Sequence, residues 1–447
     1  MAHAAPRRLP LHTKILIGLL LGAVFGILAQ VWIGDRVMEA FGREFTLKSI
    51  AEDYVRPVGR VFLYLIFMIV VPFLFSALVL GVAEIGDAKR IGRVGMRSLL
   101  MTVLLSGIAV LLGLAAVYVF DPAGNLTTEQ RANLLASYSS EKDAKANLAR
   151  AETPPDDPPL LGFIPQNPVK ESVRALEGGL LPFMFFALVF GIALASVDPE
   201  KGLPVRQLLE GLFAVSLRII DYAMALAPFG VFALVFYAAA VLGIPLLLAV
   251  GKYVLVVLGA LALHQFGTYS LALRFIAKRN PLEFFRQIRV VMLTAFGTSS
   301  SNATLPTALK AAQNEVGLPR DISSFVLTVG ATANQNGTAL FEGITILFLA
   351  DMFGMDLTTG QQLMVMGLAI VAGIGTAGVP GGAWPMIAVI LVRLGVPAEA
   401  IGLVLGVDRI LDMSRTVLNV TGDITIAACV SQMEGRGSEV PEEALSG

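Results

Sequence analysis

The chain has 447 residues, of which 55% are hydrophobic and only 15% are charged. A soluble protein of this length would carry about 25% charged residues, so the composition favours a membrane protein. The net charge of −1 gives no reason to expect a nucleic-acid partner. Because Cys429 is the single cysteine, an intramolecular disulfide and a cysteine-based metal cluster are excluded, and we expect this side chain to be a small buried apolar one.

Six apolar stretches are long enough for membrane helices, at 12–33, 57–84, 95–120, 159–197, 206–241 and 246–276. The first has an apolar run too long for a cleavable signal, so we expect a membrane helix there. Basic residues gather before the first span, between the second and third, and after the sixth. By the positive-inside rule these loops and the N-terminus are cytoplasmic, and the polar stretch 121–158 lies outside.

Two further apolar segments, 282–316 and 357–394, are interrupted by small and polar residues. The first contains GTSSSNATLPT at 297–307 and the second contains GIGTAGVPGG at 373–382. In each, a run of small residues is closed by a proline, a weak internal echo of the kind that inverted repeats leave. Two structures remain open: a pair of re-entrant hairpins whose tips meet near the bilayer midplane, or two kinked helices with small residues for close packing.

The expected last helix, 397–431, carries five ionisable residues at membrane depth, where each charge costs ~2.5–3.5 kcal/mol. Four polar residues follow one another by four, three and four positions and therefore lie on one face: Asp412, Thr416, Asn419 and Asp423. Arg415 lies one step to the side, and Asp408 and Arg409 complete the charged set. This polar stripe is suited to an ion or a small zwitterion.

The expected helix 320–350 also has a polar centre, ATANQNGTALFEG at 331–343. Gly337 would loosen the helix there, so that freed carbonyl groups could coordinate a cation. Glu342 lies in an otherwise apolar run, and burial disfavours the charged form of a carboxylate. It is therefore a candidate proton carrier, unless it lies at a membrane edge or pairs with an arginine.

These four motifs, in this order, resemble the dicarboxylate/amino acid:cation symporter family, the glutamate transporter homologues. They are the serine-rich segment, N-x-x-G-T, G-T-A-G-V-P-G and D-x-x-R-T-x-x-N-x-x-G-D. The likeness extends to GRVGMR, FIPQNP and APFGVFAL elsewhere in the chain. It implies an all-α membrane protein with eight transmembrane helices plus two re-entrant helical hairpins, a glutamate-transporter-type elevator fold. Such a protein is a homotrimer in the inner (plasma) membrane, with both termini cytoplasmic, no enzyme activity and no organic cofactor.

The resemblance also divides the chain into parts. Residues 1–94 and 159–241 would form the scaffold that holds the trimer together. Residues 95–120 and 246–431 would form the moving transport domain. Residues 121–158 would be an extracytoplasmic loop, and 432–447 a cytoplasmic tail.

Residue by residue, the resemblance places Asp412 at a substrate amino group and Arg415, with Thr338, at a side-chain carboxylate. Thr416 and Asn419 would hold the α-carboxylate and neighbouring polar atoms. The two hairpins would complete the pocket, through Ser299, Ser300, Ser301, Gly378 and Val379. The chemistry agrees, because a guanidinium binds a carboxylate in bidentate geometry and an aspartate matches an ammonium.

Glutamate or aspartate is therefore the expected substrate. A C4-dicarboxylate symporter of the same fold is an alternative, although the position of Asp412 is typically not acidic in that branch. An ion channel needs no ammonium-plus-carboxylate pocket. A membrane enzyme is disfavoured because the sequence shows no nucleophile–base pair or metal-ligand cluster.

The expected coupling ion is a proton, with sodium as a second candidate. Sodium-coupled members of the family have N-M-D-G-T where this chain has NQNGT. The usual Tyr and Thr ligands of the same sodium site become Thr102 and Leu105, and only Ser106 remains. The resemblance predicts that this site is absent.

A residual sodium site could persist at Asn334, Asn419 and Asp423. Glu342 matches the position of a glutamate that is protonated during transport in proton-coupled members. Proton symport is favoured on this ground, and a sodium-coupled symporter of the same fold is the nearest alternative.

Two ionisable residues have no role in this scheme. Arg409 could pair with its neighbour Asp408 or with Glu342. His264 in the sixth span could relay protons, although a hydrogen-bonded structural histidine is the expectation.

Overall fold

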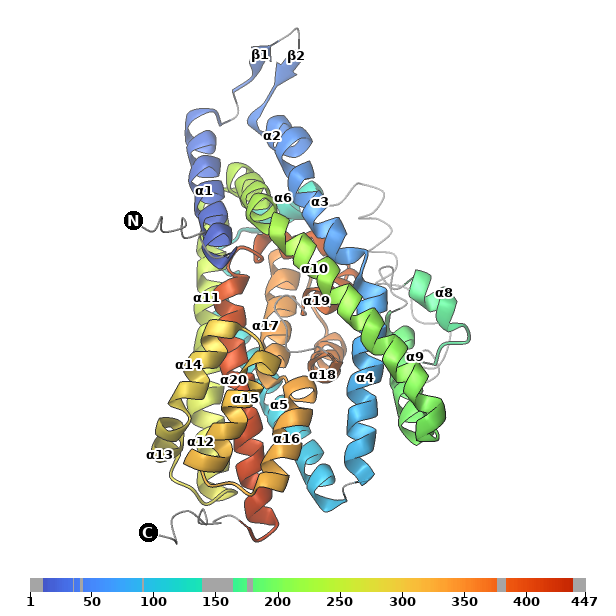
Figure 1. The fold of residues 1–447 in the computed structure, drawn as a ribbon. Helices are drawn as coiled ribbons and strands as arrows, with labels where there is room; N and C mark the ends of the chain where they lie inside the picture. Colours follow the sequence, from blue (N-terminus) through green and yellow to red (C-terminus); the bar gives the residue numbers. More distant parts are fainter. Residues whose placement is uncertain are drawn as a thin grey trace, which may run out of the picture.

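The computed structural model describes residues 11–34, 36–40, 43–90, 92–138, 164–174, 180–375 and 383–436. Over these ranges the chain is mostly helical, as expected for an all-α protein (Figure 1). The exception is a short antiparallel hairpin of β1 (Met38–Ala40) and β2 (Arg43–Phe45), which projects from one end of the molecule. Five stretches among the described residues are helical, long and apolar enough to cross a membrane, at 13–32, 47–83, 93–120, 199–241 and 244–275.

The first half of the chain ends in a helix of 44 residues, α10. Pro204 and Pro228 lie inside it. The helices of this half are α1 (Leu11–Trp32), α2 (Leu47–Ile50), η1 (Ala51–Val55), α3 (Arg56–Phe67), α4 (Val70–Arg90), α5 (Arg93–Phe120), α6 (Thr128–Tyr138), α8 (Pro168–Val173), α9 (Leu180–Ser196) and α10 (Pro199–Leu242).

A glycine seam joins α1 to α10. Gly18, Gly22 and Gly26 recur every four residues and therefore share one face of α1. A Cβ atom on Gly22 would lie 2.6 Å from the Phe232 carbonyl oxygen, which is closer than a side chain can approach. Only glycine lets the two backbones pack at this separation, a device common between membrane helices.

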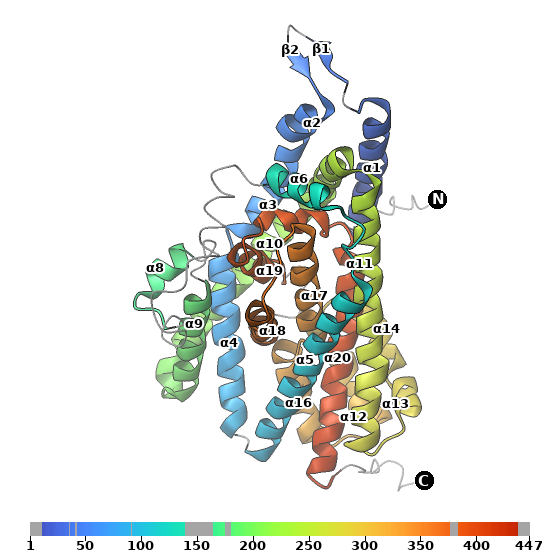
Figure 2. The same ribbon diagram turned by 180° about the vertical axis from the view of Figure 1, so that it is seen from behind.

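The second half of the chain surrounds α17, which packs against α5, α18 and α20 (Figure 2). Almost every residue of α17 is buried. The elements are α11 (Ile244–Leu263), η4 (His264–Thr268), α12 (Tyr269–Phe275), α13 (Pro281–Gln287), α14 (Arg289–Thr298), α15 (Ser301–Lys310), η5 (Ala311–Glu315), α16 (Arg320–Ala333), α17 (Asn336–Met352), α18 (Thr359–Gly375), α19 (Trp384–Arg393), η6 (Ala398–Leu403) and α20 (Asp408–Met433).

Two expected membrane helices of the first half are not continuous. The stretch 57–84 breaks between α3 and α4, because Pro72 lacks an N–H group and its ring opposes the carbonyl of Met68. The stretch 159–197 contains non-helical residues at 164–167, where Asn167 caps the short helix α8 and Pro168 begins it. Residues 159–163 and 175–179 of that stretch lie outside the described residues.

The two expected long helices of the second half were wrong in their extent. The helix 320–350 is divided into α16 and α17 by non-helical backbone at Asn334 and Gln335, two to three residues before Gly337. The helix 397–431 begins as the 3-10 helix η6 and turns at 404–407 before α20 starts at Asp408. In both cases some of the polar residues lie at a helix end, Asn334 at the end of α16 and Asp408 at the start of α20.

The segment 289–310 forms a helix–turn–helix. Ser299 has φ of 51°, in the left-handed region, and this residue reverses the chain between α14 and α15. The two helices then pack against each other and against α20. In the second interrupted segment α18 ends at Gly375 and α19 starts at Trp384, with 376–382 outside the described residues. Re-entrance into a bilayer stays a prediction for both segments.

Candidate functional site

Buried polar side chains concentrate on α20 and on the break between α16 and α17. The expected stripe lies on one face of α20, where all four of its members are at most 4% exposed: Asp412, Thr416, Asn419 and Asp423. Glu342 of α17 and Arg415 of α20 are also buried. Since α17 packs against α20, these helices bring together polar residues that are up to 90 positions apart in the chain.

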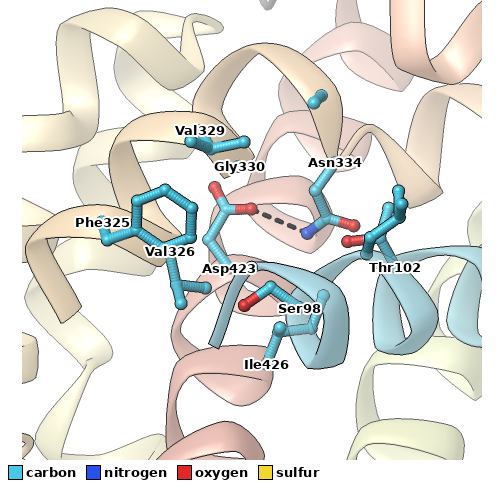
Figure 3. Close-up of a pocket in the computed structure, with 12 residues that line it drawn as sticks. Ser98, Thr102, Phe325, Val326, Val329, Gly330, Asn334, Asp423 and Ile426 are labelled. Carbon is cyan, nitrogen blue, oxygen red and sulfur yellow. Dashed lines mark hydrogen bonds between the residues drawn. The ribbon is translucent and has the colours of Figure 1, made fainter. Parts of the chain in front are cut away.

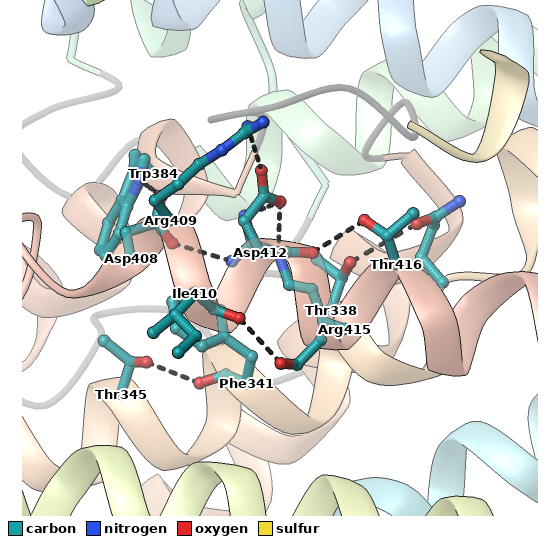
Figure 4. A network of polar contacts seen from close by, with 12 residues as sticks. Thr338, Phe341, Thr345, Trp384, Asp408, Arg409, Ile410, Asp412, Arg415 and Thr416 are labelled. Atoms are coloured by element: carbon teal, nitrogen blue, oxygen red, sulfur yellow. Dashed lines mark hydrogen bonds and ion pairs between the residues drawn. The ribbon is translucent and has the colours of Figure 1, made fainter. Parts of the chain in front are cut away.

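Two arginines and two aspartates form a charged cluster at the start of α20 (Figure 4). The Arg415 guanidinium donates from Nη2 and Nε to Asp412 Oδ1, at 2.7 and 3.0 Å. Its Nη1 donates to Asp408 Oδ1 at 3.3 Å. Arg409 Nη1 lies 3.7 Å from Asp412 Oδ2. The four formal charges cancel, which is the usual condition for burying ionised groups.

Aromatic side chains from two other helices support this cluster. The Arg415 guanidinium lies 4.4 Å from the centroid of the Phe341 ring on α17, a cation–π contact. Trp384 of α19 donates from Nε1 to Asp408 Oδ2 at 2.8 Å, and its ring meets Phe341 edge to face at 5.6 Å. Sequence reasoning missed Trp384, because no spacing rule relates it to α20. The partnership of Asp408 with Arg415 could have been found, since residues seven apart share a helix face.

Asn419 ties α20 to the break between α16 and α17. Its Nδ2 donates to Gln335 Oε1 at 2.5 Å and to Thr338 Oγ1 at 3.2 Å, and its Oδ1 accepts from Gly337 N at 2.7 Å. A Cβ atom on Gly337 would lie 2.6 Å from the Arg415 carbonyl oxygen, so this close approach of α17 to α20 requires glycine. Thr338 therefore lies beside the charged cluster but is bonded to Asn419.

The expected hairpin residues are only partly placed by the structure. Ser300 caps α15, where its Oγ accepts from Ala303 N at 3.3 Å. Ser299 and Ser301 are buried, and their hydroxyl groups have no hydrogen-bond partner among the described residues. The expected contributors from the second segment, Gly378 and Val379, lie outside the described residues.

Asp423 lies at a small cavity between α5, α16 and α20 (Figure 3). Its Oδ1 accepts from Asn334 Nδ2 at 2.7 Å, while Asn334 Oδ1 has no partner among the described residues. The cavity has a volume of about 30 Å³, enough for one water-sized species, and Ser98 and Thr102 also line it. A carboxylate, an amide oxygen and hydroxyl groups are hard ligands that suit a small hard cation.

Asn419 does not share this cavity, because its bonds lie toward Gln335 and Thr338. Of the three residues expected at a residual sodium site, the structure therefore brings only Asp423 and Asn334 together, and sodium binding there stays a prediction.

The neighbouring position Asn336 is held by neutral hydrogen bonds. Its Oδ1 accepts from Ser106 Oγ at 2.5 Å, and its Nδ2 donates to the Tyr269 hydroxyl at 3.1 Å. Tyr269 in turn donates to the Leu418 carbonyl at 3.2 Å. Leu105 of α5 is buried and brings no oxygen. At the positions where sodium-coupled relatives are expected to have ligands, this chain therefore has a network of uncharged hydrogen-bonded groups.

Glu342 is fully buried, and neither carboxylate oxygen has a hydrogen-bond partner among the described residues. It is thus neither at an edge of the molecule nor in an ion pair within the described part of the chain. An ionised carboxylate without a partner is disfavoured in such surroundings, which suits a group that takes up a proton.

Two expectations about other ionisable groups were wrong. Arg409 pairs with Asp412, three residues on, and with neither Asp408 nor Glu342. His264 is buried against the Tyr269 ring, 4.8 Å between centroids, but its two ring nitrogens have no hydrogen-bond partner among the described residues. The π-helical turn η4 begins at His264 and packs against α5 and α20. The expectation for Cys429, a small buried residue, is confirmed.

Comparison with known proteins agrees with these motifs. The model of the sodium:dicarboxylate symporter family matches residues 11–433. A proton/sodium-glutamate symport protein of Bacillus subtilis is 34% identical over 427 residues, 95% of this chain and 93% of the relative. A proton/glutamate-aspartate symporter of Escherichia coli is 31% identical over 86% of each chain. A C4-dicarboxylate transport protein of an Anaeromyxobacter strain is 28% identical over 85% of this chain and 84% of the relative.

Proposed function

Since the chain belongs to the sodium:dicarboxylate symporter family, we propose that it is a secondary active transporter that imports glutamate or aspartate by proton symport. The observation that carries the proposal is the buried pair of Asp412 and Arg415, whose charges complement an ammonium and a carboxylate. The similarity to a proton/sodium-glutamate symport protein and to a proton/glutamate-aspartate symporter supports the same substrate class.

The energetics of the charged cluster favour an acidic amino acid over a dicarboxylate. Removing one partner from a buried ion pair costs about 3–5 kcal/mol, because the other charge is left uncompensated. A ligand that separates Asp412 from Arg415 must therefore offer both charges. The ammonium of glutamate or aspartate compensates Asp412, and the side-chain carboxylate compensates Arg415. A C4-dicarboxylate would place a carboxylate next to Asp412.

The other proposed pocket residues lie on the same face of α20 as this pair or on segments that pack against it. Thr416 and Asn419 continue the same face of α20 and would hold the α-carboxylate, and Thr338 would bond to the side-chain carboxylate. The remaining contacts would come from the two interrupted segments, as the packing of α14 and α15 against α20 supports for the first of them. These contacts are Ser299, Ser300, Ser301, Gly378 and Val379.

Glu342 is the proposed proton carrier. Its burial without a partner means that the protonated form is the one compatible with an apolar surrounding. Sodium would have at most the site at Asp423 and Asn334, while the hydrogen-bonded state of Asn336 supports the loss of the other. Weak or absent sodium dependence follows.

For the architecture we propose eight transmembrane helices plus two re-entrant helical hairpins, working as an elevator in a homotrimer. The seam between α1 and α10 belongs to the proposed scaffold, 1–94 and 159–241. The polar helices α17 and α20 belong to the proposed transport domain, 95–120 and 246–431. The protein would lie in the inner membrane with both termini in the cytoplasm, and the basic loops support this orientation.

Uptake into proteoliposomes tests the function. Purified protein is reconstituted, and labelled glutamate and aspartate are offered with a proton gradient or a sodium gradient imposed separately. We expect accumulation with the proton gradient alone, and competition by unlabelled acidic amino acids but not by succinate. Accumulation that needs sodium at equal pH on both sides would overturn proton symport. Saturation and exchange across the membrane distinguish this carrier from a channel.

A further inference from the structure

Trp384 has no part in the proposed pocket, yet it reaches the charged cluster from a different helix. It begins α19 and is 1% exposed. Its Nε1 donates to Asp408 Oδ2 at 2.8 Å, and the other oxygen of that carboxylate accepts from Arg415 Nη1 at 3.3 Å. Figure 4 shows this chain of contacts, from the indole through Asp408 to the guanidinium.

We propose that Trp384 is a positioning residue for the acidic group of the substrate, and that it acts through Asp408 on Arg415. This inference rests on the proposed function and adds to it a determinant of specificity for acidic over neutral amino acids.

The geometry of Arg415 shows why Asp408 has to be held in place by the Trp384 hydrogen bond. A guanidinium presents two edges for bidentate contact, and here they bind different carboxylates. Asp412 occupies the edge of Nε and Nη2, and Asp408 occupies Nη1. When the substrate ammonium draws Asp412 away, the edge of Nε and Nη2 becomes free for the substrate carboxylate. Asp408 stays on Nη1 because the indole N–H holds its second oxygen.

Without the indole N–H, the Asp408 carboxylate can stay in place or rotate, and we expect both conformations to weaken substrate binding. Its Oδ2 becomes a buried acceptor without a donor, which is unfavourable. Rotation of the carboxylate toward Arg415 relieves that cost, but it brings both oxygens to the guanidinium and competes with the substrate. Nothing in this competition concerns the ammonium group, so the effect is confined to ligands with a side-chain carboxylate.

The test is aspartate and glutamate binding to the purified full-length protein by calorimetry, in the wild type and three variants. Trp384→Phe keeps an aromatic ring against Phe341 and removes only the donor. We expect its Kd for acidic amino acids to rise about tenfold, the size of one lost charge-assisted hydrogen bond. Asp408→Asn should also weaken binding, and the double variant should bind no more weakly than Asp408→Asn alone.

Several outcomes separate this inference from its alternatives. Equal binding by the wild type and Trp384→Phe overturns the inference and leaves the proposed function standing. Additive losses in the double variant also overturn it, because Trp384 would then act by packing alone. A wild type that binds neither amino acid removes the proposed function itself. Trp32→Phe is the matched control, since Trp32 is 70% exposed on α1, and it should bind as the wild type does.

A spectroscopic readout covers the case in which Asp408→Asn does not fold. In the Trp32→Phe protein, Trp384 is the sole tryptophan. Its emission should change when aspartate is added, because the charge around Asp408 is redistributed, and it should not change with alanine. If the Trp384 emission does not change at a saturating concentration of aspartate, the result contradicts the inference.

Discussion

Two groups of buried acids differ in whether cationic side chains compensate their charge. At the start of α20, Asp408 and Asp412 are matched by Arg409 and Arg415, and the formal charges cancel. Glu342 and Asp423, also in the core, form no ion pair within the described residues. All four acids are buried, so the difference between the two groups lies in the partners of the acids and not in their depth.

The difference indicates a division of labour. A compensated cluster can be opened only by a ligand that replaces the charges it separates, so it is suited to recognising a zwitterion with an extra carboxylate. A carboxylate without a cationic partner can be made neutral only by a proton or by a bound cation. Under the proposed function, the first group would select the substrate and the second would accept the coupling ion.

The largest expected effect comes from removing a cation from the compensated cluster. Arg415→Cys leaves Asp408 and Asp412 uncompensated and should weaken aspartate and glutamate binding by at least about 100-fold. Competition binding measures this loss, and gain of neutral amino-acid binding would sharpen it. Arg218→Cys is the control, because Arg218 is exposed on α10, where it pairs with exposed Asp221 and lies over the Tyr222 ring. Unchanged aspartate binding in Arg415→Cys would remove this residue from the pocket.

Next in size is the change of the unpaired carboxylate to its uncharged isostere. Glu342→Gln cannot gain or lose a proton, so uptake driven by a proton gradient should fall by about tenfold or more. Exchange of internal for external glutamate should persist, since exchange needs no net proton movement. Glu210→Gln, at an exposed position, is the control. If both modes survive in Glu342→Gln, the proton is carried elsewhere.

A smaller effect is expected at the Asp423 cavity. Asp423→Asn keeps an oxygen that can accept from Asn334 Nδ2 but removes the charge, so it should lower the free energy of unfolding by only about 1–1.5 kcal/mol, measured by thermal unfolding in detergent. Any rise in Tm that sodium gives the wild type should vanish in this variant, because a ligand stabilises only the state that binds it. A sodium-dependent rise that persists in Asp423→Asn would place the cation elsewhere.

The smallest effect is expected at an exposed ion pair that resembles neither group. Arg436 Nη1 lies 2.7 Å from Asp321 Oδ2, with both side chains largely exposed. Arg436→Ala should change the free energy of unfolding by less than about 1 kcal/mol and leave transport unaltered. A transport defect in this variant would show that the end of α20 has a role beyond anchoring to α16.

The polar stripe of α20 was predictable because helical spacing alone places its residues on one face. Glu342 was found for a similar reason, as an acid in an apolar run. The helix ends were not predictable. Asn334 and Gln335 break the helix before Gly337, and their side chains bond to Asp423 and Asn419 on another helix. Such a break is stabilised by tertiary contacts that no local pattern records.

Some of the partners within the charged cluster also depend on the tertiary packing of helices. Two partners were expected for Arg409, and the structure pairs it with a third, Asp412, which lies three residues on in α20 and could have been found from helical spacing. Trp384 could not be placed at all, since the path from α19 through η6 to α20 decides which residues meet. His264 shows the converse: it is a polar residue buried against Tyr269, and neither ring nitrogen has a hydrogen-bond partner in the described part of the chain.

The length of α10 has a consequence for the surrounding lipid. At 1.5 Å per residue its 44 residues extend ~66 Å, about twice the thickness of a hydrocarbon core of ~30 Å. Such a helix has to run obliquely, as it does past α3 and α4 in Figure 1, and its apolar side meets lipid at a slant. A helix longer than the hydrocarbon core is accommodated by its own tilting or kinking, or by local thickening of the bilayer. Acyl-chain length in the host membrane is therefore a mechanical variable for this protein.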